Sequence, residues 1–182
     1  MDKWTSLERL ALHFNKITAL PSFEPLCKLT MLQIHQNQIK KLPALGEMKQ
    51  LTIFDANTNM INKVPSEVQH MVALKQFNLR KNRLVFFPAE LGCCSELEIL
   101  NLGGNPLSSP IPSEFGTLGN LQTLLLDDSN VTTLCPELVN LKKLIRCNFG
   151  SRVTVEDDEE TKQTFEKLNE ICASNGGWAK RQ

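Results

Sequence analysis

At 182 residues, the sequence has the length of a single domain with one continuous core, since chains of this size bury roughly 70% of their unfolded surface. Its 20 basic and 20 acidic residues cancel, so the charge gives no overall attraction to polyanions and predicts no nucleic-acid partner. The first residues contain no apolar run, and nowhere do about 18 apolar residues follow one another, so the sequence predicts neither an export signal nor a membrane-spanning segment.

Leucines recur along the chain at a nearly constant interval. Successive units begin 22, 22, 23, 23, 24 and 23 residues apart. Within each unit, positions one, four and six are apolar, and position nine is asparagine in five of the units. An interval of this kind predicts a solenoid in which each unit forms one coil. The first leucines of the units are Leu7, Leu29, Leu51, Leu74, Leu97, Leu121 and Leu144.

Positions four to six of each unit form a triplet such as Leu10-Ala11-Leu12, in which two apolar side chains that face the core flank one that faces outward. Such a triplet predicts a short strand, and stacked copies would pair as a parallel sheet. Because side chains alternate along a strand, positions one, four and six should face the core, whereas three, five, seven and eight should project from a concave face. No coil can bury its apolar face alone, so neighbouring coils must cover it.

An asparagine follows the strand in the first five units. Its amide can both donate to and accept from main-chain groups at the turn, which the next coil covers. We expect these side chains to form a ladder along the spine, with a loss of about 1–3 kcal/mol for each one removed. The expected ladder consists of Asn15, Asn37, Asn59, Asn82 and Asn105.

After the asparagine, two further apolar positions are usually followed by a proline, as at Pro65 and Pro88. Proline stops a strand or helix from continuing and therefore fixes a corner. The segment after it, such as residues 66–71, is long enough for only a turn or two of helix on the convex side.

The pattern LxxLxLxxNxL, repeated over residues 4 to about 152, resembles the leucine-rich repeat. The unit length and the NxLxxLP continuation are similar to the typical intracellular class, found in Ras suppressor protein, Scribble-type scaffolds and plant Ras-group proteins. Residues 110–121, PIPSEFGTLGNL, depart toward the plant receptor pattern. The resemblance implies an α/β solenoid: a right-handed coil with a parallel concave sheet and a C-terminal capping helix. It also implies a scaffold or adaptor in intracellular signalling.

The pattern fades at the C-terminal end, where Ser129 replaces asparagine and Arg152 occupies another asparagine position. An acidic block at 156–160 then leads into apolar residues at helical spacing, which predicts an amphipathic helix over about 157–174, ended by Asn175-Gly176. We interpret residues 1–152 as the solenoid and 153–182 as its cap. At the other end, Trp4 already occupies a repeat position, so we expect an unsealed coil there, open to a partner, to self-association or to fraying.

Side chains at positions three, five and seven should line up in columns on the concave face. Apolar anchors ringed by polar groups are typical of protein interfaces. Scattered exposed apolar residues are also normal, but several aligned on one sheet form a patch. We therefore interpret this face as the binding surface for a protein partner of unknown identity. The candidate residues are Met31, Ile53, Asp55, Gln76, Asn78, Arg80, Ile99, Asn101, Leu125 and Asp127.

Charges should gather at two places on this face. We expect a basic spot near the middle, from Arg80 and Lys81, and an acidic spot toward the C-terminal end, from Asp127 and Asp128. Either spot could orient a partner or be ordinary solvated surface.

His13 and His35 occupy the seventh position of adjacent units and should stand side by side, with Asp55 nearby. Two imidazoles and one carboxylate are too few ligands for a convincing metal site. Gly103-Gly104 lacks the lysine or helix that a phosphate site needs. The sequence therefore predicts no metal, no cofactor and no enzymatic activity.

The six cysteines are scattered, which favours reduced thiols. Because the sequence predicts no export signal, we expect the cytoplasm or the nucleus as the location, with the cytoplasm favoured. Three hypotheses follow. The favoured one is a protein-binding adaptor or scaffold that uses its concave face. The second is a recognition subunit, monomeric or weakly self-associating, that docks through its uncapped N-terminal coil. The third, an enzyme, has the least support.

Overall fold

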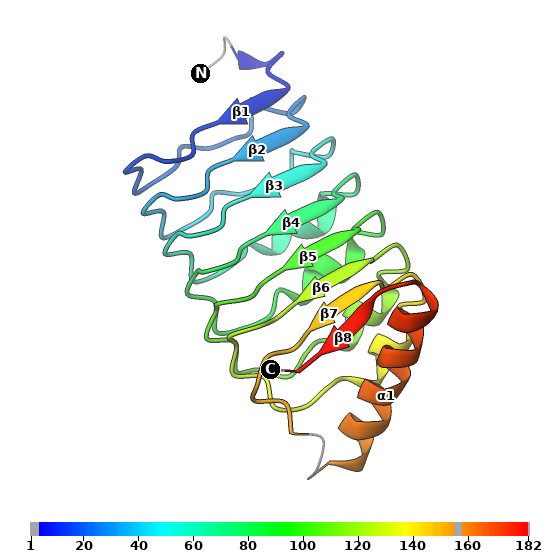
Figure 1. The fold of residues 1–182 in the computed structure, drawn as a ribbon. Coiled ribbons are helices and arrows are strands. Elements are labelled where there is room, and N and C mark those ends of the chain that lie inside the picture. Colours follow the sequence, from blue (N-terminus) through cyan, green and yellow to red (C-terminus); the bar gives the residue numbers. More distant parts are fainter. Residues whose placement is uncertain (1–3, 155–157, 182) are drawn as a thin grey trace.

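The computed structural model describes residues 4–154 and 158–181 as a stack of coils around one core (Figure 1). Each coil contributes one short strand, and the strands pair in chain order as a single parallel sheet. This arrangement confirms the predicted α/β solenoid. The strands are β1 (Arg9–Ala11), β2 (Met31–Gln33), β3 (Ile53–Asp55), β4 (Gln76–Asn78), β5 (Ile99–Asn101), β6 (Thr123–Leu125), β7 (Arg146–Asn148) and β8 (Trp178–Lys180).

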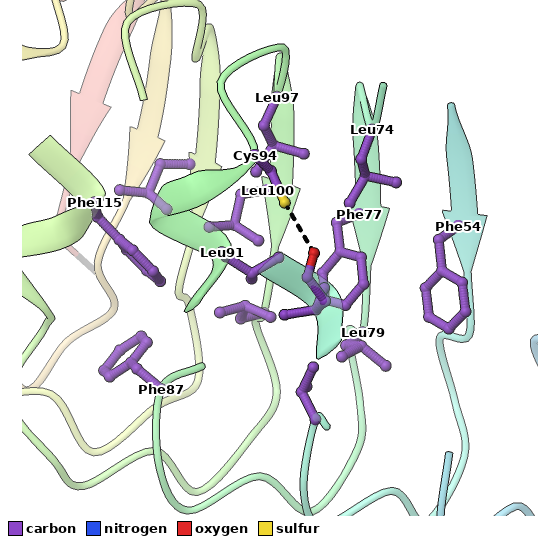
Figure 2. Close-up of a cluster of buried hydrophobic side chains, with 14 of the residues drawn as sticks. Phe54, Leu74, Phe77, Leu79, Phe87, Leu91, Cys94, Leu97, Leu100 and Phe115 are labelled. Atoms are coloured by element: carbon purple, nitrogen blue, oxygen red, sulfur yellow. Dashed lines mark hydrogen bonds between the residues drawn. The ribbon is translucent and has the colours of Figure 1, made fainter. Parts of the chain in front are cut away.

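The core lies behind the sheet and is built from the repeated apolar positions. The fourth-position residue is the middle of each strand, and pairing in register stacks these side chains, as in Phe54 against Phe77. The two rings lie 5.1 Å apart at 18° between planes, and both are fully buried (Figure 2). Coils of equal length therefore build one continuous core.

Short 3-10 helices form the convex side of the later coils: η2 (Ser66–His70), η3 (Ala89–Cys93), η4 (Ser113–Thr117) and η5 (Pro136–Asn140). Pro65, Pro88 and Pro112 immediately precede the first three, and Pro136 opens the fourth. The prediction of a short helix at 66–71 is confirmed. The connections from β1 to β2 and from β2 to β3 pass through turns instead. In the described part of the chain, no helix combines the length and apolar character needed to cross a membrane.

Asparagine side chains tie each coil to the one before it. Asn59 shows the pattern: its Nδ2 donates to the carbonyl of Ile34 in the preceding coil at 3.0 Å and to Ala56 in its own coil at 3.1 Å. Its Oδ1 accepts from the main-chain N–H of Ile39, again in the preceding coil, at 3.0 Å. The same three kinds of bond are made by Asn37, Asn82 and Asn105.

Asn15 differs from the other four ladder asparagines. It is exposed, and its Nδ2 donates only to carbonyls of its own coil, those of Leu12 and His13. Among the described strands, β1 pairs with β2 alone, so no earlier coil offers Asn15 a carbonyl or an N–H. Asn15 therefore stabilises the turn of its own coil but does not link two coils.

The eighth-position residue, which precedes the ladder asparagine or, in the sixth coil, Ser129, adopts a left-handed backbone in six successive coils. Five of these residues are not glycine, and their φ angles lie between 53° and 56°. The left-handed step turns the chain sharply after the strand and places the following residue on the core side. The six are Phe14, Gln36, Thr58, Lys81, Gly104 and Asp128.

The last coil is closed by helix α1 (Glu159–Ser174), close to the predicted span of 157–174. Asp158 caps its N-terminus by accepting the main-chain N–H of Thr161 at 3.2 Å. Residues 156 and 157 of the predicted acidic block lie outside the described residues. The buried face of α1 includes Leu168 and Cys172, which join the core. The helix therefore covers the open end of the stack, as Figure 1 shows.

Strand β8 follows the helix and was not expected. It pairs in parallel with β7, and Trp178 N–H donates to the Ile145 carbonyl at 2.8 Å. Gly177 permits this approach, because a Cβ there would lie 1.8 Å from the Ile145 oxygen. The cap thus adds its own strand to the repeat sheet, while the domain boundary at residue 152 stays a prediction.

Removing one ladder asparagine should test how the coils are coupled. Asn82→Ala leaves the buried Ile61 N–H without its acceptor and removes one of the two bonds to the Ala56 carbonyl, which keeps the bond from Asn59. We therefore expect a loss of about 1–3 kcal/mol in the free energy of unfolding. Asn15→Ala is the matched control, because that side chain bonds only within its own coil, and it should lose clearly less. Urea unfolding followed by circular dichroism measures both. Equal losses would show that bonds between coils are not what Asn82 contributes.

Candidate functional site

The open face is the side of the sheet opposite the core, made by the third and fifth positions of each coil. Residue-by-residue pairing sets these positions in straight columns. The third-position column contains Met31, Ile53, Gln76 and Ile99 in successive strands, and Gln33, Asp55, Asn78 and Asn101 follow one another in the fifth.

The open face is hollowed between β2 and β5. The hollow has a volume of about 240 Å³, and Met31, Ile53 and Ile99 supply its apolar part. All three are half-buried, whereas Gln76 between Ile53 and Ile99 is exposed. Seven of the ten predicted binding residues line this hollow: Met31, Ile53, Asp55, Gln76, Asn78, Ile99 and Asn101.

The fifth-position side chains also shape the backbone. Asp55, Asn78 and Asn101 each accept, through Oδ1, the main-chain N–H two residues later, at 3.1, 3.1 and 3.2 Å. Such bonds hold the turn that ends each strand. Within the described residues, the amide NH₂ groups of Asn78 and Asn101 donate to no other group. The hollow can therefore offer a partner two amide donors beside its apolar floor.

The three remaining predicted residues lie outside the hollow. Leu125 is paired beside Asn101 at the next strand and is half-buried. Arg80 and Asp127 form an ion pair with each other, with Nη1 and Oδ2 2.6 Å apart. Asp128 Oδ2 lies 3.8 Å from Arg80 Nη2. The expectation of separate basic and acidic spots is therefore wrong, because Arg80 reaches across an intervening coil to its partner.

Gly103 makes this ion pair possible. It occupies the seventh position in the coil between Arg80 and Asp127. A Cβ on Gly103 would lie 2.6 Å from Asp127 Oδ1 and 2.8 Å from Arg80 Nη1. The missing side chain leaves room for the two charged groups to meet over the glycine.

An aromatic corner lies at the N-terminal end of the open face. The rings of His13 and His35 stack at 4.6 Å with 3° between their planes, which confirms that the two stand side by side. Asp55 Oδ2 lies 3.5 Å from His35 Nδ1. The Nδ1 atoms of both histidines are buried and hydrogen-bond to no described residue. No cluster of three or more His, Cys, Asp or Glu side chains that could hold a metal ion occurs within residues 4–154 and 158–181.

Phe14 completes this corner, although the sequence reasoning did not single it out. Its ring meets both imidazoles edge-on, with centroids 5.4 Å away in each case, and 66% of the residue is exposed. The signal was an apolar residue at the eighth position, which elsewhere holds polar residues or glycine. Phe14 therefore adds a large exposed aromatic surface to this side of the molecule.

The cysteines are unpaired, and those whose pKa is raised are poor nucleophiles. Burial, helped by the neighbouring Cys93, raises the pKa of Cys94 to about 12, and its thiol donates to the Val68 carbonyl at 3.4 Å (Figure 2). Burial and a hydrogen bond to Glu137 raise the pKa of Cys135 to about 11. The hydrogen bond with Cys172, followed by burial, raises the pKa of Cys147. These three thiols are packing groups in this fold.

The ion pair can be tested by truncating its arginine. Arg80→Ala leaves the buried Asp127 carboxylate without its cation, so we expect a loss of about 1–3 kcal/mol in the free energy of unfolding. Lys81→Ala, at an exposed neighbouring position, should change stability by less than about 0.5 kcal/mol. In the double variant Arg80→Ala, Asp127→Ala, part of the loss should be recovered. Chemical unfolding of wild type, Arg80→Ala, Asp127→Ala and the double variant forms a double-mutant cycle, and strictly additive losses would argue against the pair.

Comparison with known proteins agrees with this architecture. The family model for the Leucine Rich Repeat matches residues 96–118, which include β5 and η4. Among curated proteins, none matches the chain. The matched residues are similar to this repeat, and the solved structures below share the fold of the whole stack.

Solved structures with similar folds come from bacteria and plants. A leucine-rich-repeat protein of Leptospira interrogans is 27% identical, with a TM-score of 0.69 over 94% of this chain and 49% of its own. An internalin of Listeria monocytogenes, 23% identical, shares the fold with a TM-score of 0.72 over 81% of this chain and 42% of its own. The ectodomain of the Arabidopsis receptor kinase HAESA, in complex with an extended IDA peptide hormone, is 29% identical, with a TM-score of 0.75 over 82% and 27%. The chain thus spans about half or less of the length of these structures.

Proposed function

We propose that this protein is a protein-binding adaptor or scaffold that recognises its partner on the open face. The observation that carries the proposal is the hollow between β2 and β5, where half-buried apolar side chains form the floor and amide groups lie beside them. Protein interfaces combine these two features, since apolar anchors supply affinity and polar groups fix orientation.

The form of the surface favours a protein or peptide over a small molecule. The hollow is shallow and runs across four strands, so it offers no enclosed site for a small ligand. The solved HAESA ectodomain is a leucine-rich-repeat structure with a bound peptide, which supports the same kind of ligand here. The activity that we propose is therefore the binding of a protein or peptide.

We further propose a cytoplasmic role in signalling, as in the typical intracellular class of leucine-rich repeats. The coil length of 22–24 residues and the prolines at the corners support that class. The six unpaired cysteines support a reducing compartment.

Charge placed among the apolar side chains of the hollow should weaken partner binding. We expect the double variant Ile53→Asp, Ile99→Asp to recover its partner at least about tenfold less well than wild type, because it puts carboxylates into an apolar contact. Val72→Asp, Gln50→Asp is the matched control, with the same two new aspartates at exposed positions outside the strands. Immobilised proteins, checked for folding by circular dichroism, would be compared by quantitative pull-down. Equal recovery by all three would move the interface away from the open face.

The N-terminal coil favours a second candidate function, docking or self-association. Leu10 and Leu12 are half-buried although their counterparts in the next four coils are fully buried, and Trp4 is 56% exposed. These three side chains line an apolar hollow of about 60 Å³ together with Pro21, Phe23 and Leu26. Apolar surface of this kind gains free energy when another molecule covers it.

Light scattering coupled to size-exclusion chromatography tests this second function. If the N-terminal hollow self-associates, the molar mass should rise with protein concentration, and Trp4→Asp should return it to the monomer value. Lys3 lies outside the described residues, so Thr5→Asp, at an exposed neighbouring position, serves as the control. A constant monomer mass at all concentrations would exclude self-association through this coil.

A further inference from the structure

The segments that follow the strands form one side of the solenoid, and all of their charged residues are basic. Positions nine to fourteen of the first five coils, residues 15–20, 37–42, 59–64, 82–87 and 105–110, contain five basic residues and no acidic one. In Figure 1 these segments are the loops at the tips of the strand arrows, stacked side by side. Main-chain bonds join them, as from Met60 N–H to the Ile39 carbonyl at 2.9 Å. The basic flank is defined by Lys16, Lys40, Lys41, Lys63 and Arg83, with Val85 and Phe86 at its C-terminal end.

The cations of the basic flank are available for a partner. All five are exposed, and none forms an ion pair with another described residue. Lys41 and Lys63 hold the same thirteenth position in adjacent coils, so stacking sets them next to each other. The balanced charge of the whole chain therefore conceals a local basic strip.

Phe86 continues the same column in the next coil. It is 72% exposed, the highest value among the large apolar side chains of the described residues, and Val85 beside it is 40% exposed. The core does not need either, because Phe87 fills the buried position of this coil, as seen against Phe115 in Figure 2. An exposed phenylalanine next to two lysines is a contact surface with an apolar and a charged part.

A broad groove of about 860 Å³ joins these parts. Lys41 and Lys63 line it with Phe86, and Pro65 and Pro88 contribute rigid apolar wall. Glu67 and Glu90, from the 3-10 helices η2 and η3, lie on the groove as well. The groove thus combines two cations, an apolar anchor point and a pair of carboxylates.

We propose that the basic flank is a second docking surface, which takes an acidic segment of a partner protein carrying an aromatic or aliphatic anchor. The anchor packs on Phe86 and Val85, and the acidic side chains pair with Lys41 and Lys63. Glu67 and Glu90 would repel a ligand that is negatively charged along its whole length, such as a nucleic acid. They therefore favour a peptide that presents its acidic side chains to the lysines and uncharged groups to the glutamates. This surface is separate from the open face, so both can be occupied at once.

Fluorescence anisotropy with the full chain tests the proposal. The probe is a short fluorescein-labelled peptide of glutamate and aspartate with two central phenylalanines. We expect Lys41→Glu, Lys63→Glu to weaken its binding by roughly tenfold or more. The matched control is Lys28→Glu, Lys49→Glu, which reverses the charge of two exposed lysines. They precede β2 and β3 and so lie at the opposite end of the strands from the basic flank, and this variant should bind within about twofold of wild type.

The apolar part has its own test. Phe86→Ser should weaken binding of the phenylalanine-containing peptide by roughly tenfold and leave an all-acidic peptide unaffected. The open-face variant Ile53→Asp, Ile99→Asp should bind the probe nearly as wild type does. Equal weakening by the two lysine pairs would overturn the proposal, as would insensitivity to Phe86→Ser. Tighter binding of a DNA duplex or of anionic phospholipid vesicles, lost in the same lysine variant, would instead assign the flank to phosphate groups.

Discussion

The asparagine that bridges two coils is the interaction on which the rest of the structure depends. A chain that turns sharply after every strand leaves main-chain carbonyls and N–H groups inside the stack, where water cannot reach them. Asn37, Asn59, Asn82 and Asn105 satisfy these groups in two coils at once. One amide therefore both shapes the turn and fixes where the preceding coil must lie. Because this contact recurs in every middle coil, neighbouring strands pair in a constant register.

That fixed register is what aligns the side chains of a repeat into continuous surfaces. A position in the unit always faces the same side, so side chains from distant parts of the chain become neighbours, as Met31 and Ile53 do on the open face and Lys41 and Lys63 do on the basic flank. The core uses other positions of the unit. Residues on either surface can therefore differ from coil to coil without disturbing the stack, which is the property that an adaptor with more than one partner requires.

The sequence predicts most of this arrangement because its periodicity carries the information. The strands, the core positions, the stacked histidines and the closing helix all follow from spacing alone. The Arg80–Asp127 pair does not, because it depends on a long side chain crossing a coil that happens to hold Gly103. The sequence did not reveal that Asp55, Asn78 and Asn101 hold the turns after their strands. A polar residue at an outward position can equally be interpreted as a contact for a ligand. Strand β8 has only three residues and belongs to no repeat, so periodicity could not reveal it.

The C-terminal end shows how the solenoid closes when the ladder stops. Ser129 stands where the sixth asparagine would be, and its shorter hydroxyl is buried without a partner among the described residues. Helix α1 supplies other contacts there: Thr161 Oγ1 accepts the Leu134 N–H at 3.1 Å, and Asn175 Nδ2 donates to the carbonyls of Lys142 and Leu144 at 2.9 Å. Asn175 thus gives main-chain carbonyls near β7 the amide that a following coil would bring. The helix therefore takes over hydrogen bonding as well as covering apolar surface, and the repeat pattern can fade at the point where the cap begins.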